Sequence, residues 1–282
     1  MMRTIMNGDV GLATQTFGAP TDLPLILAMG ATASMLWWPE QLCEGLAARG
    51  YYVIRYDHRD TGQSTTTAPG KPTYSVEDMA TDLIAIMDGL GLESAHVVGM
   101  SLGGLIGQIT ALTCPRRIRS LTLIGAEPLG WPGPELPGIA PEFLEHFASF
   151  STLDWSDRDT VTVFMLEIAR MSAGGGQRFD AARERKRIEA EIDRAVDIRS
   201  AFNHGMVGLQ SDWRGRAADI NHPVLVLHGS DDPILPLQNG EALASIIRGS
   251  RLVILEGIGH ELPPTALPRM IDEIGSFLAN VE

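Results

Sequence analysis

A serine, an aspartate and a histidine in this chain could together carry out nucleophilic catalysis. Ser101 lies in the pentapeptide Gly-Met-Ser-Leu-Gly, and Asp232 and His260 follow it in that order along the chain. A serine hydroxyl becomes an effective nucleophile when a neutral imidazole accepts its proton, and a carboxylate must orient that imidazole. We therefore expect acyl transfer with Ser101 as nucleophile, His260 as general base and Asp232 as the orienting acid.

The sequence around Ser101 has the pattern of a strand, a tight turn and a helix. An apolar run at 95–98 leads into Gly99, and apolar residues recur at helical spacing over 105–112. This pattern predicts a strained backbone at Ser101 that raises the hydroxyl above a sheet. A Gly-x-Ser-x-Gly match alone arises by chance in roughly one chain of this length in five, so the assignment depends on the strand and helix around it.

The base and the acid both have competing candidates. Of the seven histidines, His58, His228 and His260 fall near the C-terminal ends of expected strands, where an open parallel sheet collects its functional groups. His58 could instead fix the loop that it begins, and His228 fits a core or turn position. Glu127, at the end of the strand after the serine turn, competes with Asp232 as the acid, although the chain order serine, aspartate, histidine favours Asp232.

Two backbone N–H groups are needed to stabilise the negative charge on the attacked carbonyl oxygen. Leu102, directly after Ser101, is expected to supply one of them. Ala31, in the loop after the apolar run 24–30, is expected to supply the other, and the alternative is an ordinary turn between a strand and a helix. Together they would form an oxyanion hole.

The wider sequence alternates apolar runs with helical patterns, which predicts an α/β fold with a mainly parallel central sheet flanked by helices. The runs at 24–30, 51–57, 118–127, 222–229 and 251–257 are expected to be buried strands, and 10–18 an edge strand. A capping box at Ser75 and Asp78 begins one of the helices. We expect residues 1–127 and 221–282 to form the core domain.

Residues 128–220 break this alternation and predict a helical cap, or lid, inserted into the sheet domain. Helical patterns lie near 141–150, 157–172 and 179–202, and the third is so rich in charge that we expect one face of it to be solvated. The aromatic and methionine side chains of residues 128–220 suggest an adaptable apolar substrate pocket, although packing is the alternative for any one of them. The candidate pocket residues are Trp131, Phe143, Phe147, Met165, Met206 and Trp213.

Composition restricts the partners and the compartment. The net charge of −13 argues against nucleic acid or an anionic membrane as a partner. The two cysteines, Cys43 and Cys114, lie in apolar surroundings and are expected to be buried free thiols. The first residues lack the apolar core of a secretory signal, and the uncharged stretch 23–39 is too short and polar for a membrane span. We expect a cytoplasmic monomer or homodimer without a metal or cofactor.

Several segments resemble a known family, the α/β-hydrolase-fold serine hydrolases, over essentially the whole chain. LAMGATASMLWWP, YDHRDTGQS, HVVGMSLGG, DDPILP and GIGHELP are similar to the branch that contains aclacinomycin methylesterase and the serine macrolide esterases. The resemblance implies that Ser101, Asp232 and His260 form the triad and that Ala31 and Leu102 form the oxyanion hole. Many family members have His-Gly where this chain has Met-Gly, just before Ala31.

The same resemblance implies a bulky polyketide ester or lactone as substrate. Ring-opening of a macrolide lactone, and so inactivation of an antibiotic, is the first expectation, and removal of a methyl ester from an anthracycline-type compound is the second. Two other classes stay open. The triad also serves cofactor-free perhydrolases and hydrolases of carbon–carbon bonds, and the fold also serves ligand-binding proteins without catalysis.

Overall fold

The computed structural model describes residues 2–176 and 178–281. One eight-stranded sheet crosses it in the order β1-β2-β4-β3-β5-β6-β7-β8. Strands β4, β3, β5, β6, β7 and β8 pair in parallel, whereas β2 is antiparallel to both of its neighbours. The strands are β1 (Met2–Asn7), β2 (Val10–Phe17), β3 (Leu23–Ala28), β4 (Tyr51–Tyr56), β5 (Ala95–Met100), β6 (Ile118–Ile124), β7 (Val224–Gly229) and β8 (Arg251–Leu255). The predicted mainly parallel α/β sheet is confirmed.

The edge of the sheet differs from the prediction. The segment expected at the edge, β2, is an internal strand because β1 pairs along it and covers its outer side. Only Ile5 is buried in β1, so this strand has no alternation of apolar and polar residues that would reveal it.

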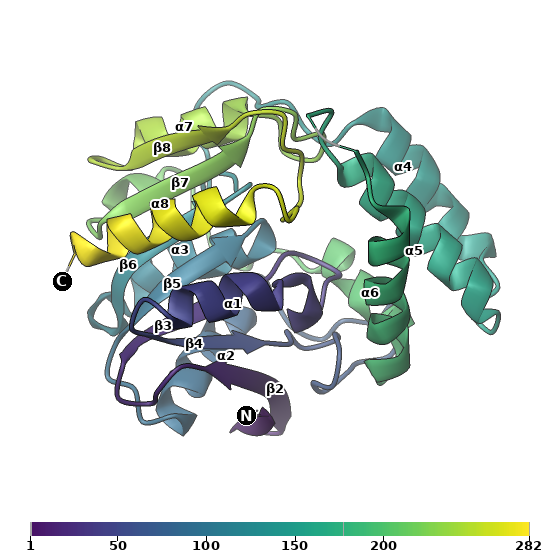
Figure 1. The fold of residues 1–282 in the computed structure, drawn as a ribbon, viewed down its shortest axis with the longest axis horizontal. Coiled ribbons are helices and arrows are strands. Elements are labelled where there is room, and N and C mark those ends of the chain that lie inside the picture. Colours follow the sequence, from purple (N-terminus) through teal and green to yellow (C-terminus); the bar gives the residue numbers. More distant parts are fainter. Residues whose placement is uncertain (1, 177, 282) are drawn as a thin grey trace.

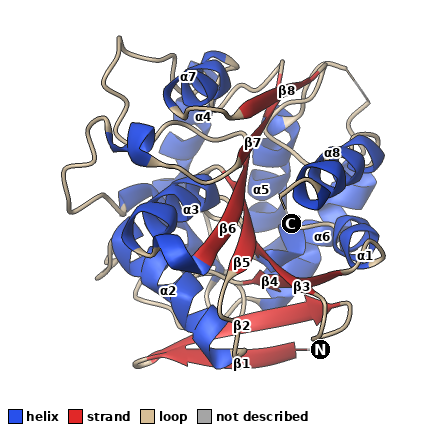
Figure 2. Cartoon of the chain, turned by 90° about the vertical axis from the view of Figure 1, so that its left-hand side faces the viewer, coloured by secondary structure: helices blue, strands red, loops and turns tan. Residues whose placement is uncertain are grey.

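Helices cover both faces of the sheet (Figure 2). On one face lie α2 (Val76–Gly89), α3 (Leu102–Thr113) and α7 (Gln238–Ile246), and on the other lie α1 (Glu40–Ala47) and α8 (Leu267–Ala279). Each face has its own apolar core, with Met79, Leu83 and Ile106 on the first and Leu42 and Met270 on the second. The predicted capping box at the start of α2 is present.

Three helices between β6 and β7 gather at one side of the sheet (Figure 1). These are α4 (Pro141–Ala148), α5 (Arg158–Ser172) and α6 (Ala181–Arg194), and they share an apolar core that includes Phe164 and Ile188. We refer to residues 128–220 as the cap, although Leu129, Ala217 and Ile220 near its ends pack in the core of the sheet. The described residues also form five 3-10 helices: Met35–Trp37, Pro115–Arg117, Ser149–Thr152, Ile198–Met206 and Arg216–Asp219.

The third cap helix is shorter than its sequence indicates. The helical pattern at 179–202 is broken, because α6 ends at Arg194 and Ala195 is extended (φ −66°, ψ 139°) before the 3-10 helix Ile198–Met206 begins. Two of its charged residues, Glu184 and Glu191, are buried. One face of the helix is exposed, as predicted, and these two glutamates lie on the opposite, buried face.

Polar contacts to the core explain why Glu191 can be buried. Glu191 accepts hydrogen bonds from the Ser34 backbone N–H (2.7 Å) and from the Trp37 indole N–H. Arg194 forms a two-pronged ion pair with the fully buried Asp57 (2.9 and 2.5 Å). Burial raises the pKa of Glu191. The charge of Arg187 and the two hydrogen bonds that Glu191 accepts lower this pKa but do not outweigh burial. Helix α6 is thus fixed to the core through buried charge.

Substitution of Glu191 with glutamine should destabilise the protein. An amide has one acceptor oxygen where the carboxylate uses two, so one buried N–H donor would lose its partner, at a cost of about 1–3 kcal/mol. Urea unfolding measures this loss. Glu189→Gln, on a half-buried position of the same helix whose carboxylate lies 3.7 Å from Arg185, should change stability by less than ~0.5 kcal/mol. Equal midpoints for the two variants would contradict the anchoring role.

The two cysteines are free, but only one of them is buried. Burial raises the pKa of the Cys43 thiol to about 12, so it is not a nucleophile at neutral pH. Cys114, at the end of α3, is only partly buried, which corrects the expectation for it.

Within residues 2–176 and 178–281, none of the helices combines the length and the apolar character that a membrane span needs.

Candidate active site

Ser101 occupies the turn between β5 and α3 with a backbone conformation that few side chains adopt. Its φ of 51° and ψ of −118° lie outside the ordinary regions, as predicted for a strained turn. The turn can be this tight because positions 99 and 103 are glycines. A Cβ on Gly103 would overlap the Ala28 carbonyl oxygen, and a Cβ on Gly99 would overlap the Gly103 carbonyl oxygen. The Ser101 N–H donates to the Ile124 carbonyl (3.0 Å), which ties the turn to the end of β6.

Asp232 and His260 form a hydrogen-bonded pair. The distance between His260 Nδ1 and Asp232 Oδ2 is 2.7 Å, and the carboxylate is fully buried. Burial alone would raise the pKa of Asp232, but His260 and the Leu235 N–H outweigh it and leave this pKa lowered. Because the carboxylate is ionised at neutral pH, Nδ1 carries the proton and donates it. His260 Nε2 is then left as the free basic nitrogen.

The end of β6 lies between Ser101 and this pair. Ile124 accepts the Ser101 N–H, and a Cβ added to the next residue, Gly125, would lie 3.1 Å from His260 Nδ1 and 3.2 Å from Asp232 Oδ2. Ser101, Asp232 and His260 therefore lie at the carboxyl ends of β5, β7 and β8, in one half of the parallel sheet. This is the edge where an open α/β sheet places its functional groups.

The loop that carries His260 is fixed by the cap. The His260 N–H donates to the Ser172 carbonyl at the end of α5 (2.8 Å), and a Cβ on Gly259 would overlap that same oxygen. From the cap side, the Gly174 N–H donates to Glu261 (3.0 Å) and the Gly175 N–H to Asp231 (3.0 Å). The glycines after α5 thus form a close backbone contact rather than a free linker, which sequence reasoning missed.

Both expected oxyanion donors lie beside Ser101. Leu102 begins α3 directly after it, and a Cβ on Gly30, the neighbour of Ala31, would lie 3.3 Å from the Ser101 Cβ. Within the described part of the chain, no hydrogen bond occupies the N–H of Ala31 or Leu102. Two free N–H groups near a serine hydroxyl can stabilise an oxyanion.

The competing candidates have other contacts. His58 is buried and bonded through Nε2 to the Met29 carbonyl (2.8 Å), and His228 Nε2 is bonded to the Leu235 carbonyl (2.7 Å). Glu127 follows β6 at the same edge, and burial raises its pKa, but His260 Nδ1 is bonded to Asp232. The geometry thus favours Asp232 and His260 over these alternatives.

Buried neutral histidines should make the protein less stable in mild acid. Burial lowers the pKa of His58 to about 3 and that of His96 to about 4, whereas an unfolded histidine titrates near 6.5. From pH 6.5 down to about 4 the unfolded chain therefore binds more protons. The free energy of unfolding should fall by ~1.4 kcal/mol per pH unit for each fully titrating histidine.

Urea unfolding at pH 7, 6 and 5 would measure this slope. His96→Asn keeps a polar atom toward Ser120, the partner of His96 Nδ1 (2.7 Å), and should make the slope shallower whatever it does to stability at pH 7. If the pH dependence of the unfolding free energy is the same in this variant as in the wild type, buried neutral His96 does not contribute to it.

The six candidate pocket residues do not share one environment. Trp213 packs in the core cluster on the α2 face, and its indole N–H donates to Glu77 (2.9 Å), so it is a packing residue. The Trp131 indole N–H donates to the nearby Pro134 carbonyl (2.8 Å), and Met206 is 62% exposed. The other three are in the cap helices, where the rings of Phe143 and Phe147 are neighbours and Met165 belongs to the cap core.

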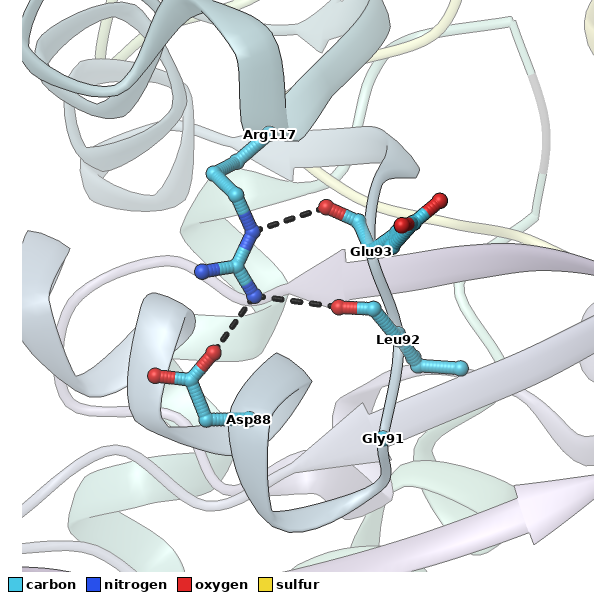
Figure 3. A pocket seen from close by; sticks show the side chains of 5 residues that line it. All are labelled: Asp88, Gly91, Leu92, Glu93 and Arg117. Atoms are coloured by element: carbon cyan, nitrogen blue, oxygen red, sulfur yellow. Dashed lines mark hydrogen bonds and ion pairs between the residues drawn. The ribbon is translucent and has the colours of Figure 1, made fainter.

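Two surface hollows lie away from Ser101. A hollow of about 430 Å³ is lined by Asp88, Gly91, Leu92, Glu93 and Arg117 (Figure 3). The Arg117 guanidinium is occupied there by Asp88 (2.6 Å) and by the carbonyls of Leu92 and Glu93. These residues precede β5 and β6, so the hollow lies at the opposite edge of the sheet from Ser101. A second hollow of about 380 Å³ lies along α2 and α3.

Among the described residues, no group of three or more His, Cys, Asp and Glu side chains is placed to hold a metal ion.

Comparison with known proteins agrees with the fold. Residues 24–266 match the family model of the alpha/beta hydrolase fold. The chain is 34% identical over 276 residues to rhodomycin D methylesterase of Streptomyces peucetius, covering 93% of this chain and 92% of that one. A hydrolase structure from Pseudomonas aeruginosa is 27% identical with a TM-score of 0.73, covering 98% of both chains. A bromoperoxidase structure from Bacillus anthracis, 22% identical with a TM-score of 0.81, covers 99% of this chain and 100% of its own and shares the fold.

The chain therefore belongs to the α/β-hydrolase family. Within that family it falls in an esterase branch, and it is a carboxylic-ester hydrolase.

Proposed function

We propose that this protein is a serine esterase in which Ser101, His260 and Asp232 form the catalytic triad. The observation that carries the proposal is the His260–Asp232 pair (2.7 Å), held beside the strained turn that presents Ser101. The free Nε2 of His260 accepts the Ser101 proton as Oγ attacks the ester carbonyl. The N–H groups of Ala31 and Leu102 stabilise the resulting oxyanion.

The remaining steps use the same groups. His260 returns the proton to the departing alcohol, and the acyl group stays on Ser101. A water molecule then gives its proton to His260 and attacks the acyl carbonyl, and collapse of this second intermediate releases the acid and restores the Ser101 hydroxyl.

For the substrate, we favour the methyl ester of a bulky anthracycline-type polyketide. Similarity over 93% of the chain to a rhodomycin D methylesterase supports this choice over the macrolide lactone that the sequence first suggested. The cap would cover Ser101, and Phe143, Phe147 and Met165, which lie on its helices α4 and α5, are the remaining candidates for an apolar pocket. The partner is thus a small molecule.

A panel of compounds would test this choice. Wild-type protein and Ser101→Ala are incubated with an anthracycline-type methyl ester, a macrolide lactone and simple aryl esters, and the products are weighed by mass spectrometry. We expect replacement of the methyl ester by a free acid in the wild type only. Water addition to the lactone with no methyl ester cleavage would instead favour macrolide ring opening. Oxidation of halide with peroxide, without ester turnover, would indicate perhydrolase chemistry.

A further inference from the structure

Two buried histidines contact the loop that carries Ala31, and the Ser-His-Asp chemistry uses neither. His204, in the cap, accepts a hydrogen bond at Nδ1 from the Thr32 N–H (3.0 Å). His58, in the core, contacts the Met29 carbonyl through Nε2 (2.8 Å). The two contacts lie on either side of Gly30 and Ala31.

The partners determine the protonation of both rings. A backbone N–H can only donate, so His204 Nδ1 is unprotonated, and its Nε2 carries the proton that it donates to the Arg59 carbonyl (2.8 Å). The Met29 carbonyl can only accept, so His58 donates from Nε2. Burial lowers the pKa of both histidines, which keeps the rings neutral, and they meet edge to face at 6.0 Å.

The loop between these contacts needs support. Thr32 has a φ of 65°, a left-handed conformation that a β-branched residue rarely adopts. Such a conformation persists where the surrounding structure holds it. The bond from Thr32 to His204 is therefore made at the strained residue, one position after the expected oxyanion donor Ala31.

We propose that His204 and His58 are positioning residues that hold the Ala31 N–H in its oxyanion-binding place. They act through the backbone of the loop 29–32 and do not touch the substrate. Because His204 belongs to the cap, docking of the cap on the core would then complete the oxyanion hole. This inference rests on the proposed function, in which Ala31 supplies one of the two oxyanion donors.

Asparagine and glutamine variants test the proposal because each keeps one ring nitrogen position. The Asn amide oxygen can replace Nδ1 as an acceptor, and the Gln amide nitrogen can replace Nε2 as a donor. At His204 the bond to the loop uses Nδ1, so His204→Asn should keep kcat within about 5-fold of wild type, whereas His204→Gln should lose about 10²-fold, the typical cost of a displaced catalytic group.

At His58 the order should reverse. The bond to the loop uses Nε2, so His58→Gln should retain kcat and His58→Asn should lose it, with KM little changed in both. His222→Gln is a matched control, since His222 Nε2 bonds the Pro115 carbonyl (2.9 Å) before β7, and it should turn over like the wild type.

Aryl ester hydrolysis measures kcat and KM, and titration of active sites with a fluorophosphonate corrects for any unfolded fraction. The reversed order at the two positions would support the proposal, and if one variant does not fold, the pair at the other histidine still tests it. The same order at both positions, or equal kcat values, would overturn it while leaving the triad intact. If Ser101→Ala hydrolyses the ester as fast as wild type, the proposed function fails and this inference fails with it.

Discussion

Replacement of Ser101 with alanine is expected to lower kcat by about 10⁴- to 10⁶-fold, because the proposed acyl intermediate forms on the Ser101 Oγ that alanine lacks. The residual rate would come from the oxyanion donors and from substrate binding. Alanine at this position has the same strained φ of 51°, so the strain of the turn is unchanged. Steady-state kinetics with an aryl ester measure the loss of kcat, and a thermal melt checks that the variant is as stable as the wild type.

The control for this variant is a serine outside the site. The Ser245 hydroxyl, in α7, donates to the Ala242 carbonyl (2.7 Å) of its own helix, and Ser245→Ala should keep full activity. A Ser101→Ala enzyme within tenfold of wild-type activity would rule out the acyl-enzyme mechanism.

Replacement of Asp232 with asparagine is expected to lower kcat by about 10⁴-fold, the size of effect known for the equivalent change in chymotrypsin-like enzymes. Asp232 Oδ1 accepts two N–H groups, from Ile234 (2.9 Å) and Leu235 (2.8 Å). The Asn oxygen would keep those bonds and turn its NH₂ toward His260 Nδ1. That nitrogen must then accept, so the proton moves to Nε2, and the ring can no longer take the Ser101 proton.

The neighbouring aspartate provides the matched control. The Asp231 carboxylate accepts hydrogen bonds from Ser230 and from the Gly175 N–H, whereas His260 Nδ1 is bonded to Asp232. Asp231→Asn should therefore stay within about tenfold of wild type. Equal losses in the two variants would mean that Asp232 acts through the fold of the turn and not through the His260 tautomer.

Much of the sheet and of the site could be predicted from the sequence because their signals are local. Buried parallel strands leave continuous apolar runs, and the serine turn requires glycine where backbones nearly touch, as at Gly103. Asp232 and His260 follow strands β7 and β8, and the carboxyl ends of parallel strands meet at one edge.

The contacts between cap and core could not be predicted, because their signals are not local. Glu191 and Arg194 lie in a charged helix, and their partners Ser34, Trp37 and Asp57 are distant in sequence. These partners allow Glu191 to be buried and Arg194 to be partly buried. The contact of His204 with Thr32 joins positions 172 residues apart. Likewise, β1 was missed because one buried residue, Ile5, leaves no periodic pattern.

The most direct test of the account is to identify the residue that a fluorophosphonate modifies. The probe reacts with an activated serine, and peptide mass spectrometry locates the adduct. We predict modification of Ser101, in step with the loss of ester hydrolysis, and much slower modification in Asp232→Asn. Continued hydrolysis by protein whose Ser101 is fully modified would contradict the assignment of Ser101 as the nucleophile.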